Sequence, residues 1–94
     1  MKESTIEKKV CDYAKEKGWL CFKFMSLSNR GVPDRMFMKL GIVFFIEFKS
    51  PGKKPTKFQL LQINKIAQSG IMVFVCDDID QGKQIIDNFK ATHE

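Results

Sequence analysis

The sequence predicts one small α/β domain whose mixed central sheet is flanked by helices. Three features carry this prediction: two amphipathic segments with helix-start signals, two strand-like runs joined by a short turn, and a connection of helical length before the last strand. With 94 residues the chain has room for a single core, so we expect one domain over residues 1–94. The expected element order is α, β, β, β, α, β, α.

The N-terminal part predicts a helix, a strand and a loop. Ser4 and Glu7 have the spacing of a capping box, apolar residues follow at helical spacing, and Gly18 marks the expected end of the helix. Residues 19–25 are aromatic-rich and alternate in polarity, which is typical of a strand. Residues 26–33 break the pattern with Ser, Asn, Gly and Pro, which indicates a loop.

The middle of the chain predicts a hairpin. Residues 34–39 and 42–49 form two strand-like runs around Leu40 and Gly41. Leucine is a poor residue for the positive φ of a two-residue turn. A longer loop with a bulge at Gly41, which would shift the register by one, is therefore the alternative.

The second half predicts a helix, a strand and a weaker helix. Thr56 and Gln59 repeat the capping-box spacing, and the helical pattern continues to Gly70. Residues 71–76 form a short apolar run that we expect to be a strand buried on both faces and parallel to its neighbour. The last helix begins in an acidic stretch, which favours a helix start over a second metal cluster: Asp77, Asp78 and Asp80.

Composition and charge narrow the function classes. The net charge of +5 and a pI near 9.2 favour a polyanionic partner, with nucleic acid first. The odd number of cysteines without a CxxC pair predicts neither disulfides nor zinc, and the single histidine, His93, makes histidine-based catalysis improbable. The N-terminus lacks an apolar signal core, and no apolar run approaches the ~20 residues that span a bilayer, so we expect a cytoplasmic protein.

Two charged residues interrupt the apolar strand and suggest chemistry. Glu47 and Lys49 share one face because their spacing is two. A two-residue turn would place Asp34 opposite Glu47, and opposed carboxylates repel unless a proton or a cation lies between them. Mg²⁺ binds through one or two carboxylates, so this pair predicts a Mg²⁺ or Mn²⁺ site with Lys49 near the water or the phosphate. The plainer interpretation is a strand end that emerges into solvent.

These residues resemble the virus-type replication-repair nuclease (VRR-NUC) domain of the PD-(D/E)XK superfamily. The matching order is Gly31-Val32-Pro33-Asp34-Arg35, then Ile46-Glu47-Phe48-Lys49, a Pro-Gly loop, and Pro55-Thr56 with Gln59. The resemblance implies a restriction-endonuclease-like core of order αβββαβ(α). It also implies that Asp34, Glu47 and the backbone carbonyl of Phe48 hold the metal, while Lys49 acts on the water or the phosphate.

Two accessory residues are expected from the same resemblance. Glu7 occupies the place of an acidic residue on the first helix, and Gln59 that of a glutamine on the next helix. Each residue also has a purely structural explanation in its capping box. Ile63 stands where many related nucleases have a tyrosine, so the helix motif is incomplete.

Basic residues surround the predicted site and suggest sequence-independent phosphate contacts. They are Arg30, Arg35, Lys53, Lys54 and Lys57. A small domain without a recognition appendage favours DNA shape over sequence, which predicts an endonuclease for four-way junctions or flaps. The resemblance further implies a virus-encoded repair enzyme that acts as a homodimer, with no organic cofactor. The alternatives are a non-catalytic nucleic-acid-binding module, a nuclease subunit that needs a partner, and a structural domain with a chance motif.

Overall fold

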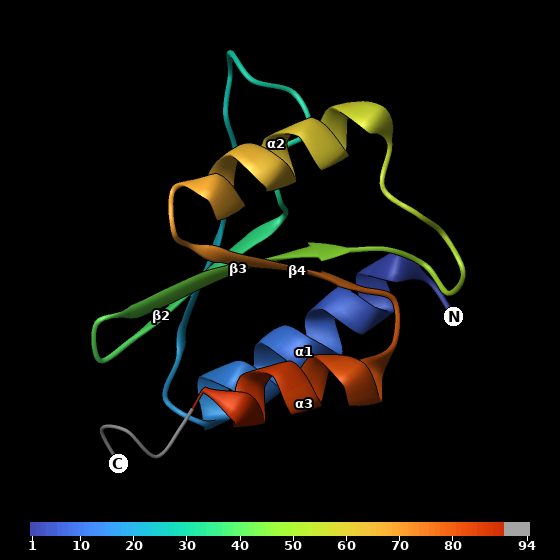
Figure 1. The fold of residues 1–94 in the computed structure, drawn as a ribbon. Helices are drawn as coiled ribbons and strands as arrows, with labels where there is room; N and C mark the ends of the chain where they lie inside the picture. Colours follow the sequence, from blue (N-terminus) through green and yellow to red (C-terminus); the bar gives the residue numbers. More distant parts are fainter. Residues whose placement is uncertain (90–94) are drawn as a thin grey trace.

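The fold has the element order that the sequence predicts (Figure 1). This computed structural model describes residues 1–89, so His93 lies outside the described residues. The helices and strands are α1 (Glu3–Glu16), β1 (Leu20–Lys23), β2 (Arg35–Lys39), β3 (Ile42–Phe48), α2 (Lys57–Gln68), β4 (Met72–Cys76) and α3 (Ile79–Asn88). None of the helices in this part of the chain is long and apolar enough to cross a membrane.

The four strands form one mixed sheet in the order β1-β2-β3-β4. The first three strands are antiparallel, and β4 runs parallel to β3, which confirms the predicted parallel final pair. Helix α2 covers one face of the sheet, while α1 and α3 lie side by side on the other face (Figure 1). The domain is therefore three layers deep.

The hairpin between β2 and β3 has the short turn and the unshifted register. Lys39 pairs with Ile42, and Arg35 pairs with Ile46. Leu40 adopts a φ of 49° in the left-handed region, which costs a non-glycine residue on the order of 1 kcal/mol. The pairing along both strands offsets this strain, so the bulged alternative does not form.

The main core lies between the sheet and the pair α1 and α3. Residues 44, 46 and 48 of β3 point to this side and are buried with the apolar faces of both helices. Phe44 is the centre of an aromatic cluster, stacked at 4.9 Å on Phe37 and at 4.5 Å on Phe89, with Trp19 edge-on at 5.0 Å. These rings pack in the core and are not available to stack on bases.

Two local predictions are wrong. Helix α1 begins one residue before Ser4, with Lys2 as N-cap and no side-chain cap, because Ser4 already lies in the first turn and cannot take the extended N-cap conformation. Strand β4 is not buried on both faces, since it forms the edge of the sheet and Met72 is 52% exposed.

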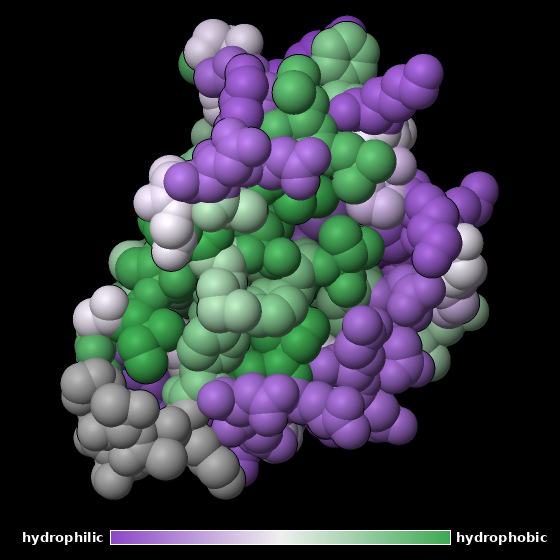
Figure 2. Space-filling view, in the orientation of Figure 1, coloured by the Kyte–Doolittle hydropathy of each residue, from purple (hydrophilic) through white to green (hydrophobic). Residues whose placement is uncertain are grey.

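Figure 2 shows apolar residues gathered along the middle of the visible face of the molecule.

The contact between α1 and α3 depends on a glycine. A Cβ on Gly82 would overlap a methyl group of Val10 and lie 3.1 Å from Cys76 Sγ. We expect Gly82→Ala to lower the free energy of unfolding by about 1–3 kcal/mol, measured by urea denaturation. Gln84→Ala, at an exposed position of the same helix, is the control and should change it by at most about 0.5 kcal/mol. Unchanged stability of Gly82→Ala would contradict this packing.

Candidate active site

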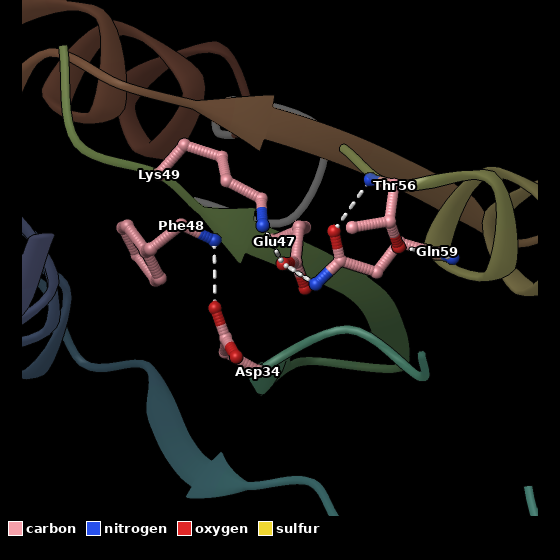
Figure 3. Close-up of polar contacts among 6 residues, drawn as sticks. All are labelled: Asp34, Glu47, Phe48, Lys49, Thr56 and Gln59. Carbon is pink, nitrogen blue, oxygen red and sulfur yellow. Dashed lines mark hydrogen bonds and ion pairs between the residues drawn. The ribbon is translucent and has the colours of Figure 1, made fainter. Parts of the chain in front are cut away.

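The hairpin brings Asp34, Glu47 and Lys49 together at one end of the sheet (Figure 3). Asp34 directly precedes β2, Glu47 is the penultimate residue of β3, and Lys49 follows that strand. Asp34 Oδ2 accepts a hydrogen bond from the Phe48 N–H at 2.8 Å, which ties the aspartate to the opposite strand. The three residues that the sequence predicts as the core of the site therefore lie together.

Glu47 is a buried carboxylate, only 2% exposed. Its Oε2 accepts a hydrogen bond from Gln59 Nε2 at 2.8 Å and lies 3.3 Å from Lys49 Nζ. Its Oε1 is buried and has no hydrogen-bond partner among the residues that the structure describes. A buried carboxylate oxygen without a protein partner is rare and requires a water, a proton or an ion.

Gln59 has both of its predicted roles, as part of a capping box and as a partner of the site. The capping box is present: the Thr56 N–H donates to Gln59 Oε1 at 2.9 Å, and the Gln59 N–H donates to Thr56 Oγ1 at 3.2 Å. The amide nitrogen of the same side chain donates to Glu47 (Figure 3). The cap thus orients the amide so that its donor end points at the buried carboxylate.

Glu7 does not form a capping box. Its Oε2 accepts a hydrogen bond from Arg35 Nε at 2.6 Å, and both side chains are largely buried. The pair lies on the α1 side of the sheet, so Arg35 is not displayed on the surface as Arg30 is. Burial is the main cause that raises the pKa of Asp34, and the charge of Glu7 adds to it.

One acidic residue whose charge reaches the site, Glu3, is not among the residues predicted from the sequence. Glu3 begins α1, and its charge contributes to raising the pKa of Glu47, although less than the other causes do. Glu3 precedes Glu7 by four residues, so both lie on one face of the helix. That spacing was the available signal for Glu3.

The ionised form of each carboxylate is disfavoured, because the pKa of both Glu47 and Asp34 is raised. Burial, followed by the charge of Asp34, raises the pKa of Glu47 from 4.5 to about 7, and Lys49 partly opposes the shift. Burial also raises the pKa of Asp34, against the hydrogen bond from Phe48. A cation between the two carboxylates would relieve the repulsion and the desolvation of both.

The donor set fits a hard divalent cation. Asp34 and Glu47 supply two carboxylates, with an unpartnered oxygen on Glu47, and the backbone carbonyl of Phe48 lies between Glu47 and Lys49 in the chain. Within residues 1–89, no three His, Cys, Asp or Glu side chains gather so that they alone could hold a metal ion. Mg²⁺ does not need such a cage, because it uses one or two carboxylates and keeps several waters.

The lysine-rich loop after β3 borders the site. Lys53, Lys54 and Lys57 are exposed. The Gly52 N–H donates to Asp77 Oδ2 at 3.0 Å, which fixes the loop to the start of α3. Asp78 caps α3 by accepting from the Gln81 N–H, so these aspartates belong to a helix start as predicted.

The raised pKa of Glu47 predicts how stability depends on pH in the metal-free protein. The folded state holds this proton more tightly than the unfolded state, so the stabilisation is present below pH 4.5 and is lost as the pH rises to about 7. We expect the free energy of unfolding in EDTA to fall by on the order of 3 kcal/mol across this range. Urea titrations should show a much flatter profile for Glu47→Gln. A wild-type profile that rises with pH would contradict this.

Comparisons with known proteins agree with this geometry. No family model matches the chain. A protein of Acyrthosiphon pisum secondary endosymbiont phage 1, named "Putative nuclease p44", is 37% identical over 81 residues, which cover 85% of this chain and 87% of the phage protein.

The structure comparison gives the same result for the fold. A solved VRR_NUC domain superposes with a TM-score of 0.85 and 24% identity, covering 94% of this chain and 97% of that domain. The similarity in sequence to the phage protein and the shared fold together show that the chain belongs to a family of nucleases with the VRR_NUC fold.

Proposed function

We propose that this protein is a divalent-metal-dependent endonuclease that hydrolyses phosphodiester bonds in branched DNA, such as four-way junctions and flaps. Membership of a nuclease family supports nuclease activity in general. The observation that carries the metal requirement is the buried, unpartnered Oε1 of Glu47 beside Asp34. A protein that only binds DNA gains nothing from a carboxylate in this environment, because the carboxylate repels phosphates and its burial destabilises the fold.

Each residue of the site has a proposed role. Asp34, Glu47 and the carbonyl of Phe48 would hold Mg²⁺ or Mn²⁺, and Glu7 supports the site from α1. When bound, the ion would lower the pKa of water and neutralise charge on the phosphate. Gln59 keeps the Glu47 carboxylate in place through the contact at 2.8 Å.

Lys49 is the proposed group that acts on the reacting atoms. Its ammonium group lies 3.3 Å from Glu47 Oε2, and its side chain is 13% exposed, so it is held near the carboxylates and still reaches the surface. From this position it can orient a water or stabilise the negative charge that develops on the phosphate. It cannot accept a proton while it remains an ammonium ion, so charge stabilisation is its first expected role.

The preference for branched DNA rests on what the domain lacks and on its charge. Residues 1–89 contain the VRR-NUC fold without an added recognition element, and the exposed cations beside the site suit phosphate contacts rather than base readout. They are Arg30, Lys53, Lys54 and Lys57. The similarity to a phage protein supports a virus-encoded enzyme that acts in the cytoplasm of its host.

A homodimer would place two such sites at a fixed separation for paired cuts. The main apolar residues of α1 and α3 are buried in the core, so they are not available for a contact between two copies. Exposed apolar side chains lie instead on α2 and β1: Phe58, Leu60, Leu61, Leu20 and Phe22. These side chains are the better candidates for contact between two copies.

Cleavage assays with site variants test the proposal. Labelled four-way junction, flap, linear duplex and single-stranded DNA are incubated with Mg²⁺, Mn²⁺ or EDTA. We expect cleavage of the branched substrates only with metal, and its loss in Asp34→Ala and Lys49→Ala, because the first removes a metal ligand and the second removes the charge beside the phosphate. DNA binding by Lys49→Ala should remain close to that of the wild type.

The outcomes separate the alternatives. A folded wild-type protein that binds branched DNA and cuts no substrate with either metal would favour the non-catalytic module or a nuclease that needs a partner protein. Equal loss of binding and cleavage in Lys49→Ala would remove the catalytic role of Lys49 and make it a binding residue.

The salt dependence of binding tests the lysine-rich loop. Each phosphate contact contributes about 0.9 to the slope of log K against log salt concentration. We expect the double variant Lys53→Ala, Lys54→Ala to reduce the slope by about 1–2 and to weaken binding equally for different DNA sequences. Lys9→Ala, Lys15→Ala, on the exposed side of α1, is the charge-matched control and should leave the slope unchanged. Equal slopes for both double variants would show that the loop does not contact phosphates.

A further inference from the structure

The loop of residues 25–33, which we call the wedge loop, is fixed at both of its ends. The Phe24 N–H donates to the Asp34 backbone oxygen at 2.8 Å, which closes the loop directly at the candidate metal ligand. The Phe24 ring packs on Phe45 at 4.8 Å, and Pro33 is fully buried. The loop is thus anchored to the sheet beside the site.

A third anchor holds the wedge loop against α2. Gly31 has a φ of 81°, and a Cβ at this position would lie 2.8–2.9 Å from backbone atoms of Phe58 and Gln59. Only glycine permits so close an approach without a shift of one backbone. The loop therefore contacts the helical turn whose Gln59 holds Glu47, so its position is tied to both sides of the site.

The tip of the wedge loop is shaped and apolar. The Asn29 N–H donates to Ser26 Oγ at 3.1 Å, which forms a turn around Leu27. Leu27 is fully exposed and Met25 is 72% exposed. In Figure 1 the loop, in turquoise, projects beyond α2 at the top of the view.

An isolated exposed leucine is ordinary on a protein surface. Leu27 differs because it lies at the tip of an anchored loop that ends at Asp34, and because cations flank it. Arg30 is exposed on the same loop, and Lys23 is exposed just before it, at the end of β1. An apolar tip between cations is the arrangement of side chains that enter the DNA base stack while neighbouring residues bind phosphates.

We propose that Leu27, assisted by Met25, is a wedge that inserts against the end of the base stack at a DNA branch point. The inference rests on the proposed function for its substrate class and adds how the branch is recognised. Separating stacked bases costs least where a base pair already lacks a neighbour, so a wedge favours branches over continuous duplex. Because the wedge loop ends at Asp34, it fixes the distance between the branch and the phosphate presented to the site.

Fluorescence of 2-aminopurine tests insertion without cleavage. The base is placed at the branch of a flap DNA, and wild-type protein is added in EDTA. We expect a rise in fluorescence as the base unstacks, and little rise with Leu27→Ala. The control is Leu40→Ala, which removes another exposed leucine. Leu40 lies at the hairpin turn, away from the wedge loop, so this variant should behave as the wild type.

Binding and cleavage preference give the second readout. Removal of the Leu27 side chain from water against the base stack should contribute a factor of roughly ten in affinity, so Leu27→Ala should reduce the preference for flap over linear duplex by about tenfold, both in binding and in cleavage with Mg²⁺. Leu27→Phe, which restores a large apolar tip, should recover most of the preference.

The failure of this inference differs from the failure of the proposed function. Unchanged fluorescence and unchanged preference in Leu27→Ala, with normal metal-dependent cleavage, would overturn the wedge and leave the nuclease. Loss of dimerisation in Leu27→Ala, with the fluorescence rise intact, would overturn it by assigning the tip to a protein interface. Absence of cleavage on every DNA, with the fluorescence rise lost only in Leu27→Ala, would support the wedge and contradict a nuclease that acts without a partner protein.

Discussion

The burial of the Glu47 carboxylate beside Asp34 is the constraint on which the rest of the site depends. An ionised carboxylate that is 2% exposed is costly unless its oxygens are bonded. One oxygen is satisfied by Gln59 and Lys49, and the other has no partner among residues 1–89. The surrounding elements keep the carboxylate in place, and this fixed position is what the proposed cation site requires.

The alternation of side chains along β3 explains how one strand serves both the core and the site. Phe44, Ile46 and Phe48 point to α1 and α3 and are fully buried, whereas Glu47 points to α2 and meets Gln59. The larger core therefore lies on the face away from the Glu47 carboxylate. A mutation of the core and a mutation of the site can thus have separable effects, although both act on the same strand.

The sequence predicted those parts of the site that are determined by residues close together in the chain. The two-residue turn fixed the relation between Asp34 and Glu47 because pairing continues residue by residue from Lys39 and Ile42. The strain at Leu40 was visible in the sequence, but the total pairing energy that outweighs it was not. The capping box at Thr56 was also visible, and it gave the place of Gln59 without revealing that its amide nitrogen reaches Glu47.

Contacts between distant segments account for what the sequence did not predict. The partner of Glu7 is Arg35, which lies 28 residues away, and local spacing favoured a cap instead. The exposure of β4 depends on its place at the sheet edge, which its apolar composition does not reveal. The close approach of Gly31 to α2 likewise joins two segments that no local motif connects. Since Asp34 follows one of these segments and Gln59 lies on the other, a small change in their packing would move both sides of the carboxylate pair at once, and the separation of the two carboxylates is therefore a property of the whole fold.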